Sequence, residues 1–309
     1  MKKLPRKGQR RPVKPDLKPT RPASNQPAFP KPTSPKRSRD RSQSESPSRS
    51  RNESQKRSPK ESSNLPSNLP PIEDQRRPAF SRILVVLYED DAVVVLDKPA
   101  GLLSVPIKGS ETPSALTLLA AKLKPKRERA LIVHRIDRFA SGILVFAKTN
   151  PDRNSLVKQF LAHTPVRHYL AVVRGRLDAQ SETIVHYFRR EGMYQLLRSA
   201  KDPSATRAEL RYKVERLFAN ASLVRVELVT GLQNQIRAQF SALGHPLVGD
   251  RKYRRAESSE PLIARVALHA AHIEFVHPRT GKNITIDCKL PNDFQHLVRE
   301  LSRSDPKRP

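Results

Sequence analysis

The sequence contains a single cysteine, Cys288, so no disulfide can form within the chain. Such a chain suits a reducing compartment, and we expect a cytoplasmic protein. Its ten glycines form neither a G-x-G-x-x-G motif nor a P-loop, which excludes two common signatures of nucleotide binding. No apolar run approaches the length of a membrane span, so we expect no membrane-inserted segment.

Acidic residues are scarce relative to basic ones. Lysine and arginine number 59 against 30 acidic residues, which gives a net charge of +29. A charge of this size predicts a polyanionic partner. Because the chain shows no amphipathic basic helix and no lipidation signal, nucleic acid is a better candidate than a membrane surface.

Residues 1–80 differ in composition from the rest of the chain. They hold 15 of the 28 prolines, together with 21 basic and 7 acidic side chains. Such a segment cannot bury a core, so we predict a disordered basic tail that is either an RNA-binding arm or a solvated linker. It lacks the apolar core of a secretory signal, whereas its richness in Arg and Ser leaves an organelle transit peptide open. Residues 81–309 are long enough for one domain.

Hydrophobic patterning in residues 81–309 predicts an α+β fold. The segment 83–105 predicts two short strands that flank a Glu-Asp-Asp turn and are followed by a proline–glycine turn. Further strands are predicted at 130–133, 142–147, 167–175, 209–217 and 222–231. Short connections favour antiparallel pairing, so we expect a mixed, mostly antiparallel central sheet flanked by helices.

Three helices are predicted from capping residues and apolar spacing. Thr112 and Pro113 are typical of a helix start before ALTLLAAKL, and Asn150 and Pro151 of a second start. The second helix is expected to place Leu156, Val157, Phe160 and Leu161 on one face. The third, within 234–244, is expected to bury Ile236, Phe240 and Leu243 and to end at Gly244.

The segment HRIDRFASGILVFAKT, residues 134–149, places an aspartate between two arginines and two apolar runs. Arg135, Asp137, Arg138 and Ser141 are expected in the loop that connects the flanking strands. Burying a carboxylate is costly unless partners hold it, and a nearby arginine favours the ionised form. Asp137 is therefore a candidate nucleophile or base, and a structural ion pair that braces the turn is the alternative.

Three further features could complete an active site: Tyr169 in RHYLAVV, Arg237 in NQIR and the turns of GHPLVGDRKY at 244–253. Each has a structural explanation when it is taken alone. A strand tyrosine is commonly part of the core, and a helical arginine commonly faces solvent or phosphate.

Taken together and in order, these blocks resemble the RluA-type pseudouridine synthase family. The resemblance rests on YEDDAVVVLDKPAGLLSV, HRIDRFASGILVFAKT, RHYLAVVRG, TGLQNQIRAQFSALGHPLVGDRKY and LHAAHIEFVHPRTG, and it covers residues 83–290. It implies isomerisation of uridine in structured RNA, in which the N-glycosidic bond breaks and uracil is rejoined through its carbon 5. It also implies that no cofactor is needed.

The resemblance assigns roles to individual residues. Asp137 matches the nucleophilic aspartate, which attacks the sugar or the base. Tyr169 matches the tyrosine that stacks on uracil and takes part in proton transfer, and Arg237 matches the arginine that pairs with the aspartate. Arg135 matches the residue that fills the space left when the target nucleotide flips out. We also expect Arg138, Asn234 and Gln235 to contact RNA.

This chain departs from the family pattern T-G-R-x-H-Q-[IL]-R at two positions, where it has Leu232 and Asn234. We expect these residues to affect the choice of substrate more than activity. We also expect no separate RNA-binding domain before the catalytic domain. Ribosomal large-subunit RNA is the first expected target and transfer RNA the second, and we expect a monomer.

The sequence supports other functions less well. His269 and His272 lie three residues apart, but no suitably spaced Cys or acidic partner supports a metal site, so none is predicted. Ser141 lacks the G-x-S-x-G context of a serine nucleophile. A non-catalytic RNA-binding or ribosome-assembly factor on the same fold is the main alternative, and a condensing protein driven by its tail is another.

Overall fold

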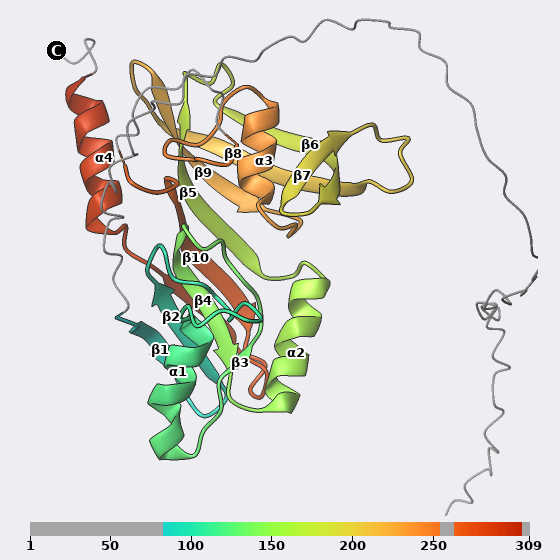
Figure 1. Cartoon of the computed structure of the whole chain (residues 1–309), viewed down its shortest axis with the longest axis vertical. Coiled ribbons are helices and arrows are strands. Elements are labelled where there is room, and N and C mark those ends of the chain that lie inside the picture. Colours follow the sequence, from blue (N-terminus) through green and yellow to red (C-terminus); the bar gives the residue numbers. More distant parts are fainter. Residues whose placement is uncertain (1–82, 254–262, 305–309) are drawn as a thin grey trace, which may run out of the picture. The chain divides into compact units, whose positions relative to one another are not determined.

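The computed structural model describes residues 83–253 and 263–304, and the predicted tail at 1–80 lies outside them. The described elements all belong to one structural unit, Leu69–Pro309 (Figure 1). Within 83–253 and 263–304, no helix has the length and apolar character needed to cross a membrane.

Eleven strands form one sheet in the order β1-β2-β4-β10-β5-β9-β8-β6-β7, with β3 paired to β4 and β11 to β10. Their bounds are β1 Val85–Glu89, β2 Val93–Lys98, β3 Leu131–Ile132, β4 Ser141–Ala147, β5 Val166–Arg174, β6 Ser181–Glu191, β7 Tyr194–Arg198, β8 Thr206–Leu217, β9 Ala221–Leu228, β10 Leu268–Val276 and β11 Asn283–Asp287. Every pair is antiparallel except β4 with β10. The mixed, mostly antiparallel sheet and the α+β class are thereby confirmed.

Helices cover both faces of this sheet. Their bounds are α1 Ala115–Leu123, the short 3₁₀ helix η1 Lys124–Lys126, α2 Asn150–Leu161, α3 Gln235–Ala242 and α4 Asn292–Arg303. The main core joins α2 and α3 to the strands through Leu156, Ile236 and Phe240. Alternate strand residues point the other way and form two smaller clusters with α1 and α4. The candidate site lies on the α2 and α3 face.

Burial explains why the strand predictions succeed where they do. In β8 the side chains of Ala208, Leu210, Tyr212 and Val214 are buried at every second position, as the alternating sequence indicates. All seven residues of β4 are buried, which fits an apolar run in the middle of a sheet. The segment at 130–133 yields only the two-residue strand β3, not a central strand.

The predicted start of α1 was wrong by two residues. Ser114, not Thr112, is the N-cap, because its hydroxyl accepts from the Thr117 amide while the Thr117 side chain accepts from the Ser114 amide. At α2 the cap is Thr149 rather than Asn150, and the helix ends with Leu161 75% exposed instead of on the buried face. α3 ends as predicted, with Gly244 at a φ of 86°.

One other expectation needs correction. Ser141 is not in the connecting loop but is the first, buried residue of β4, where its hydroxyl lies 2.9 Å from Nδ1 of His269. His269 and His272 both belong to strand β10. Strands β6, β7, β10 and β11 and helix α4 were not predicted.

Candidate active site

Asp137 lies in the loop between β3 and β4, and its side chain is 19% exposed. The segment that follows β2 braces this loop. The Gly101 amide donates to the Arg138 carbonyl at 2.8 Å, and Nε of Arg138 donates to the Gly101 carbonyl at 3.0 Å. The Ser104 hydroxyl donates to the Ile136 carbonyl at 2.8 Å. These bonds fix the backbone on both sides of the carboxylate.

Lys98 adds a buried charge beneath the same loop. Its ammonium group donates to the carbonyl oxygens of Pro99, Leu102, Arg138 and Ala140 at 2.7 to 3.2 Å. Burial lowers the pKa of Lys98 to about 7, while the charge of Asp137 acts in the opposite direction. Since four carbonyl oxygens surround three N–H groups, the ammonium form is the one that this cage fits.

Arg237, on α3, reaches Asp137 across one hundred positions of sequence. Its Nη1 donates to Oδ2 of Asp137 at 3.2 Å. Its Nε and Nη2 are held by the two oxygens of Asp250 at 2.7 and 2.8 Å. Burial alone would lower the pKa of Arg237, but the bonds and charge of Asp250 outweigh it and raise that pKa. Asp250 therefore anchors the guanidinium, and Asp137 shares it through one oxygen only.

The backbone after α3 carries Asp250 to this position. Gly249 has a φ of 72°, and a Cβ there would lie 2.0 Å from the Arg265 carbonyl oxygen, so only glycine fits. The Asp250 side chain is fully buried and also accepts from the amides of Lys252 and Tyr253 at 2.8 and 3.1 Å. Such a saturated carboxylate is a rigid support.

Asn234 and Gln235 are placed inside the protein rather than on its surface. Asn234 is 9% exposed; its Oδ1 accepts from Nη1 of Arg237 at 2.9 Å, and its Nδ2 donates to the Met193 carbonyl at 3.2 Å. Gln235 is 2% exposed and bonds to Thr230, Leu232, Glu209 and Gln239. With their amides engaged in this way, both side chains support the loop before α3. Their predicted contact with RNA stays a prediction.

Tyr169 projects from β5 into the main core and is 7% exposed. Burial raises the pKa of Tyr169, Arg167 opposes this effect and the charge of Asp137 adds to it. The phenol is therefore protonated at neutral pH, and its ring is held rigidly.

Arg135 and Arg138 both lie exposed in the Asp137 loop. The Arg138 guanidinium carbon lies 5.3 Å from the centre of the neighbouring Phe139 ring. A positively charged rim thus flanks the carboxylate on the outside.

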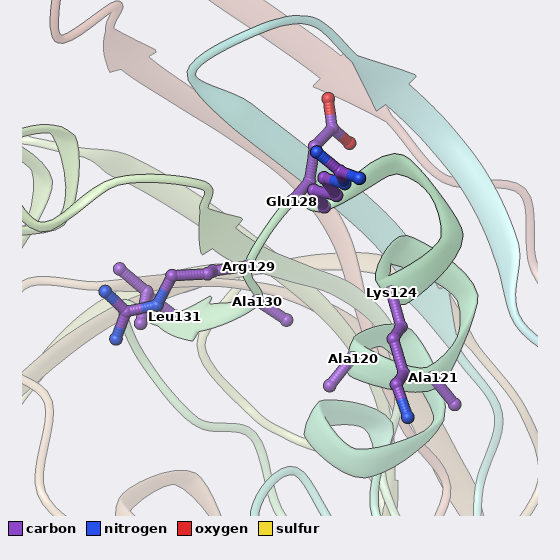
Figure 2. A pocket seen from close by; sticks show the side chains of 8 residues that line it. Ala120, Ala121, Lys124, Glu128, Arg129, Ala130 and Leu131 are labelled. Atoms are coloured by element: carbon purple, nitrogen blue, oxygen red, sulfur yellow. The ribbon is translucent and has the colours of Figure 1, made fainter.

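A pocket of about 530 Å³ lies elsewhere, along α1, η1 and β3 (Figure 2). It is lined by Ala120, Ala121, Lys124, Arg127, Glu128, Arg129, Ala130 and Leu131. None of the candidate catalytic residues lines this pocket, so it is separate from the chemistry proposed below.

The two histidines of β10 have separate surroundings. His269 is fully buried and contacts Ser141 and the Cys288 carbonyl oxygen, at 2.9 and 3.2 Å. His272 contacts Asp287 and Glu274. Within 83–253 and 263–304, no three His, Cys, Asp or Glu side chains are grouped so that they could hold a metal ion.

The arrangement is that of a positioned carboxylate. Arg237 fixes Oδ2 of Asp137, and Oδ1 makes no hydrogen bond to a described residue. A partly buried carboxylate with one free oxygen can act as a nucleophile. Sequence reasoning missed Asp250 and Lys98, although both lie in segments that it singled out, GHPLVGDRKY and LDKPAGLL.

Comparison with known proteins places this site in a family. Residues 92–242 match the family described as RNA pseudouridylate synthase. The chain is 34% identical, over 72% of its length and 74% of the relative's, to ribosomal large subunit pseudouridine synthase D of Zymomonas mobilis. It is 33% identical to ribosomal large subunit pseudouridine synthase C of Yersinia pestis, over 71% of this chain and 69% of that protein.

Solved structures agree on the fold. Human RNA pseudouridylate synthase domain containing 4 superposes with a TM-score of 0.59 at 21% identity, covering 70% of this chain and 92% of that one. Human RNA pseudouridylate synthase domain containing 1 gives 0.54 at 22% identity, over 73% and 97%. The sequence match to the Zymomonas relative and the shared fold together show that this chain belongs to the RNA pseudouridylate synthase family, of the RluA type that its motifs resemble.

Proposed function

We propose that this chain isomerises uridine to pseudouridine in ribosomal large-subunit RNA, with Asp137 as the nucleophile. The observation that carries the proposal is the contact between Asp137 and Arg237, which orients a partly buried carboxylate in a chain of this family. The relatives named as large-subunit synthases support the choice of RNA. Transfer RNA is the second candidate substrate.

The reaction exchanges one glycosidic bond for another and moves one proton. The bond between ribose C1′ and uracil N1 breaks, C1′ bonds to C5, the proton leaves C5 and N1 takes up a proton. Asp137 attacks the sugar or the base through its free oxygen, and the covalent bond formed in this way breaks again once uracil is rejoined through C5, which regenerates the carboxylate. Arg237 holds the other oxygen so that the carboxylate meets the substrate in one orientation. Asp250 keeps Arg237 in place, and Lys98 keeps the backbone of the Asp137 loop in place.

Tyr169 supplies a flat, buried surface beside the reacting groups. A rigid aromatic ring stacks on a base at a gain of about 1–3 kcal/mol. Its raised pKa supports a protonated phenol in the resting enzyme, so any proton transfer through Tyr169 begins from the neutral hydroxyl. Arg135 and Arg138 would bind the RNA around the flipped nucleotide, because both are exposed and charged.

The test is a transcriptome-wide pseudouridine map of cells that lack this protein, complemented with wild type or with Asp137→Asn. We expect one or a few sites in large-subunit RNA to vanish and only the wild type to restore them. Asn keeps the size of the side chain and its bond to Arg237 but removes the nucleophilic charge, so the expected loss of activity is complete.

The matched control is Asp178→Asn, a change of the same kind outside the site described here. It is expected to restore modification fully. If no site changes in cells without the protein, or if Asp137→Asn restores modification, the catalytic assignment fails and a non-catalytic RNA-binding role becomes the better explanation.

A further inference from the structure

Arg167 is a buried cation on β5, two residues before Tyr169, and it is 9% exposed. Its Nη2 donates to the backbone carbonyls of Leu228 and Thr230, at 3.1 and 3.4 Å. Its guanidinium carbon lies 5.7 Å from the centre of the Phe160 ring. These contacts hold the guanidinium in place but do not neutralise it.

The charge of Arg167 has no acidic partner among the described residues. The other two buried arginines, Arg237 and Arg265, are each held through two nitrogens by an aspartate, Asp250 and Asp293. Nε of Arg167, by contrast, is buried without a hydrogen-bond partner. Burying an arginine normally requires a compensating negative charge. Arg167 thus carries a buried positive charge that no described side chain compensates.

One edge of this guanidinium remains accessible. Nη1 makes no hydrogen bond to a described residue and, unlike Nε, is not among the buried atoms that lack a partner. It lies next to Gly231, where an added Cβ would come within 3.2 Å of it. Gly231 has no side chain to cover the charge, and it belongs to the loop between β9 and α3 that leads to Arg237.

Arg167 is close to the reacting groups. Tyr169 lies two positions along the same strand and therefore points to the same face of the sheet. The charges of both Arg167 and Asp137 act on the phenol of Tyr169. His134, stacked on Phe160, has its pKa lowered to about 3 by burial and then by the charge of Arg167, so it stays neutral and adds no second cation.

We propose that Arg167 binds a phosphate group of the RNA backbone next to the target uridine, through Nη1 at the opening beside Gly231. The inference rests on the proposed function, because RNA is the polyanion that this function brings to the site. A guanidinium that is fixed, desolvated and uncompensated binds phosphate more strongly than an exposed arginine does. Arg167 thereby holds the target nucleotide against Tyr169.

The first test is Arg167→Gln in the full chain, with a large-subunit RNA transcript that the wild type modifies. We expect the RNA Kd and KM to rise about tenfold. We also expect the slope of log K against log salt to become shallower by about 0.7–0.9. The matched control is Arg176→Gln, because Arg176 also donates to a backbone carbonyl, that of Phe218, but lies beyond the other end of β5. It should change neither quantity.

The second test is Gly231→Ala, which covers Nη1 and leaves the charge in place. It is expected to weaken RNA binding as Arg167→Gln does, with an unchanged Tm, and it decides the matter if Arg167→Gln does not fold. Unchanged RNA affinity in Gly231→Ala overturns the proposal, and so does an Arg167→Gln variant that loses kcat with an unaltered salt slope. If the wild type modifies no transcript, the proposed function fails, whereas the binding comparison with Arg176→Gln still judges Arg167.

Discussion

At the scale of single residues, Asp250 determines how Asp137 is held. The sequence identified Asp137 as a candidate and gave no sign of the role of Asp250. Asp250 is fully buried and binds Arg237 with both oxygens, whereas Asp137 takes one bond at 3.2 Å. An arginine paired with Asp137 alone would draw that carboxylate into a full ion pair. The second aspartate satisfies the guanidinium and leaves Asp137 oriented but available.

Asp250→Asn should therefore damage both stability and catalysis. Removing one partner of a buried ion pair leaves Arg237 uncompensated, which costs about 3–5 kcal/mol in the free energy of unfolding. The displaced guanidinium should lower kcat about a hundredfold, since misplacement by about 1 Å is enough. Urea unfolding and single-turnover kinetics on an unmodified transcript that the wild type modifies measure the two effects.

Asp152→Asn is the matched control, because Asp152 is also buried and also pairs with an arginine, but Arg279 is 45% exposed. Solvent can rehydrate Arg279, so the expected loss is about 1 kcal/mol, without an effect on kcat. Equal losses in the free energy of unfolding of the two variants would show that Asp250 contributes no more to stability than Asp152 does.

Asp137, Tyr169 and Arg237 could be found from the sequence because each sits in a short, distinctive local motif. The parts played by Asp250 and Arg167 could not. Asp250 depends on a turn at Gly249 that folds back onto α3, and Arg167 is exceptional only for the partner that it lacks. Contacts of this kind arise from tertiary packing, which local patterns do not encode.

At the scale of elements, the same limit explains which strands were predicted. In β8, buried residues alternate with less buried ones from Ala208 to Val214, so its sequence pattern predicts a strand. β6 buries only Ile184 and Phe188 across eleven residues, and its polar sequence gives no such signal. Its place in the sheet comes from pairing with β7 and β8. The caps of α1 and α2 were misplaced for a related reason, because several Ser, Thr and Asn residues compete at each helix start.

Strands β5, β10 and β11 also create a pair of histidines with opposite acid–base behaviour. The rings of His168 and His272 stack with centres 5.0 Å apart. Burial would lower the pKa of His272, but its bonds to Asp287 and Glu274 prevail and raise it above 6.5. Burial, followed by the charge of His272, lowers the pKa of His168 below 6.5.

An NMR titration of the histidine ring carbons should therefore find His272 titrating above 6.5 and His168 below it. For His272, the stabilisation is fully present below the unfolded pKa and is lost as pH rises through the folded one. For His168 the sign is opposite, and its neutral form favours the fold above the unfolded pKa. The contribution of His272 is at most about 1 kcal/mol, since its partner Asp287 is 81% exposed.

Asp287→Asn is the control for this assignment, because it removes one acceptor from His272 and leaves His168 in place. It should move the His272 titration to lower pH. If His168 titrates at a higher pH than His272 in both the wild type and the variant, the electrostatic explanation is contradicted.

At the scale of the whole molecule, we expect the basic charge of residues 1–80 and that of the folded part to have different tasks. Residues 1–80 hold 21 basic and 7 acidic side chains, and the rest of the chain is basic as well. In the folded part, Arg135 and Arg138 lie beside the candidate nucleophile, where geometry matters. We expect the charge of residues 1–80 to raise affinity for RNA in general without choosing the uridine.

Deleting residues 1–80 should accordingly change how tightly RNA binds but not how fast bound uridine reacts. Each phosphate contact that is lost should flatten the dependence of log K on log salt by about 0.7–0.9, while kcat at saturating RNA stays unchanged. A chain of full length with the 21 basic residues of the tail replaced by glutamine separates charge from length. If the glutamine tail restores the wild-type slope, charge is not what the tail contributes. If kcat falls with the deletion, the tail belongs to the catalytic machinery and the division of tasks between the two regions is wrong.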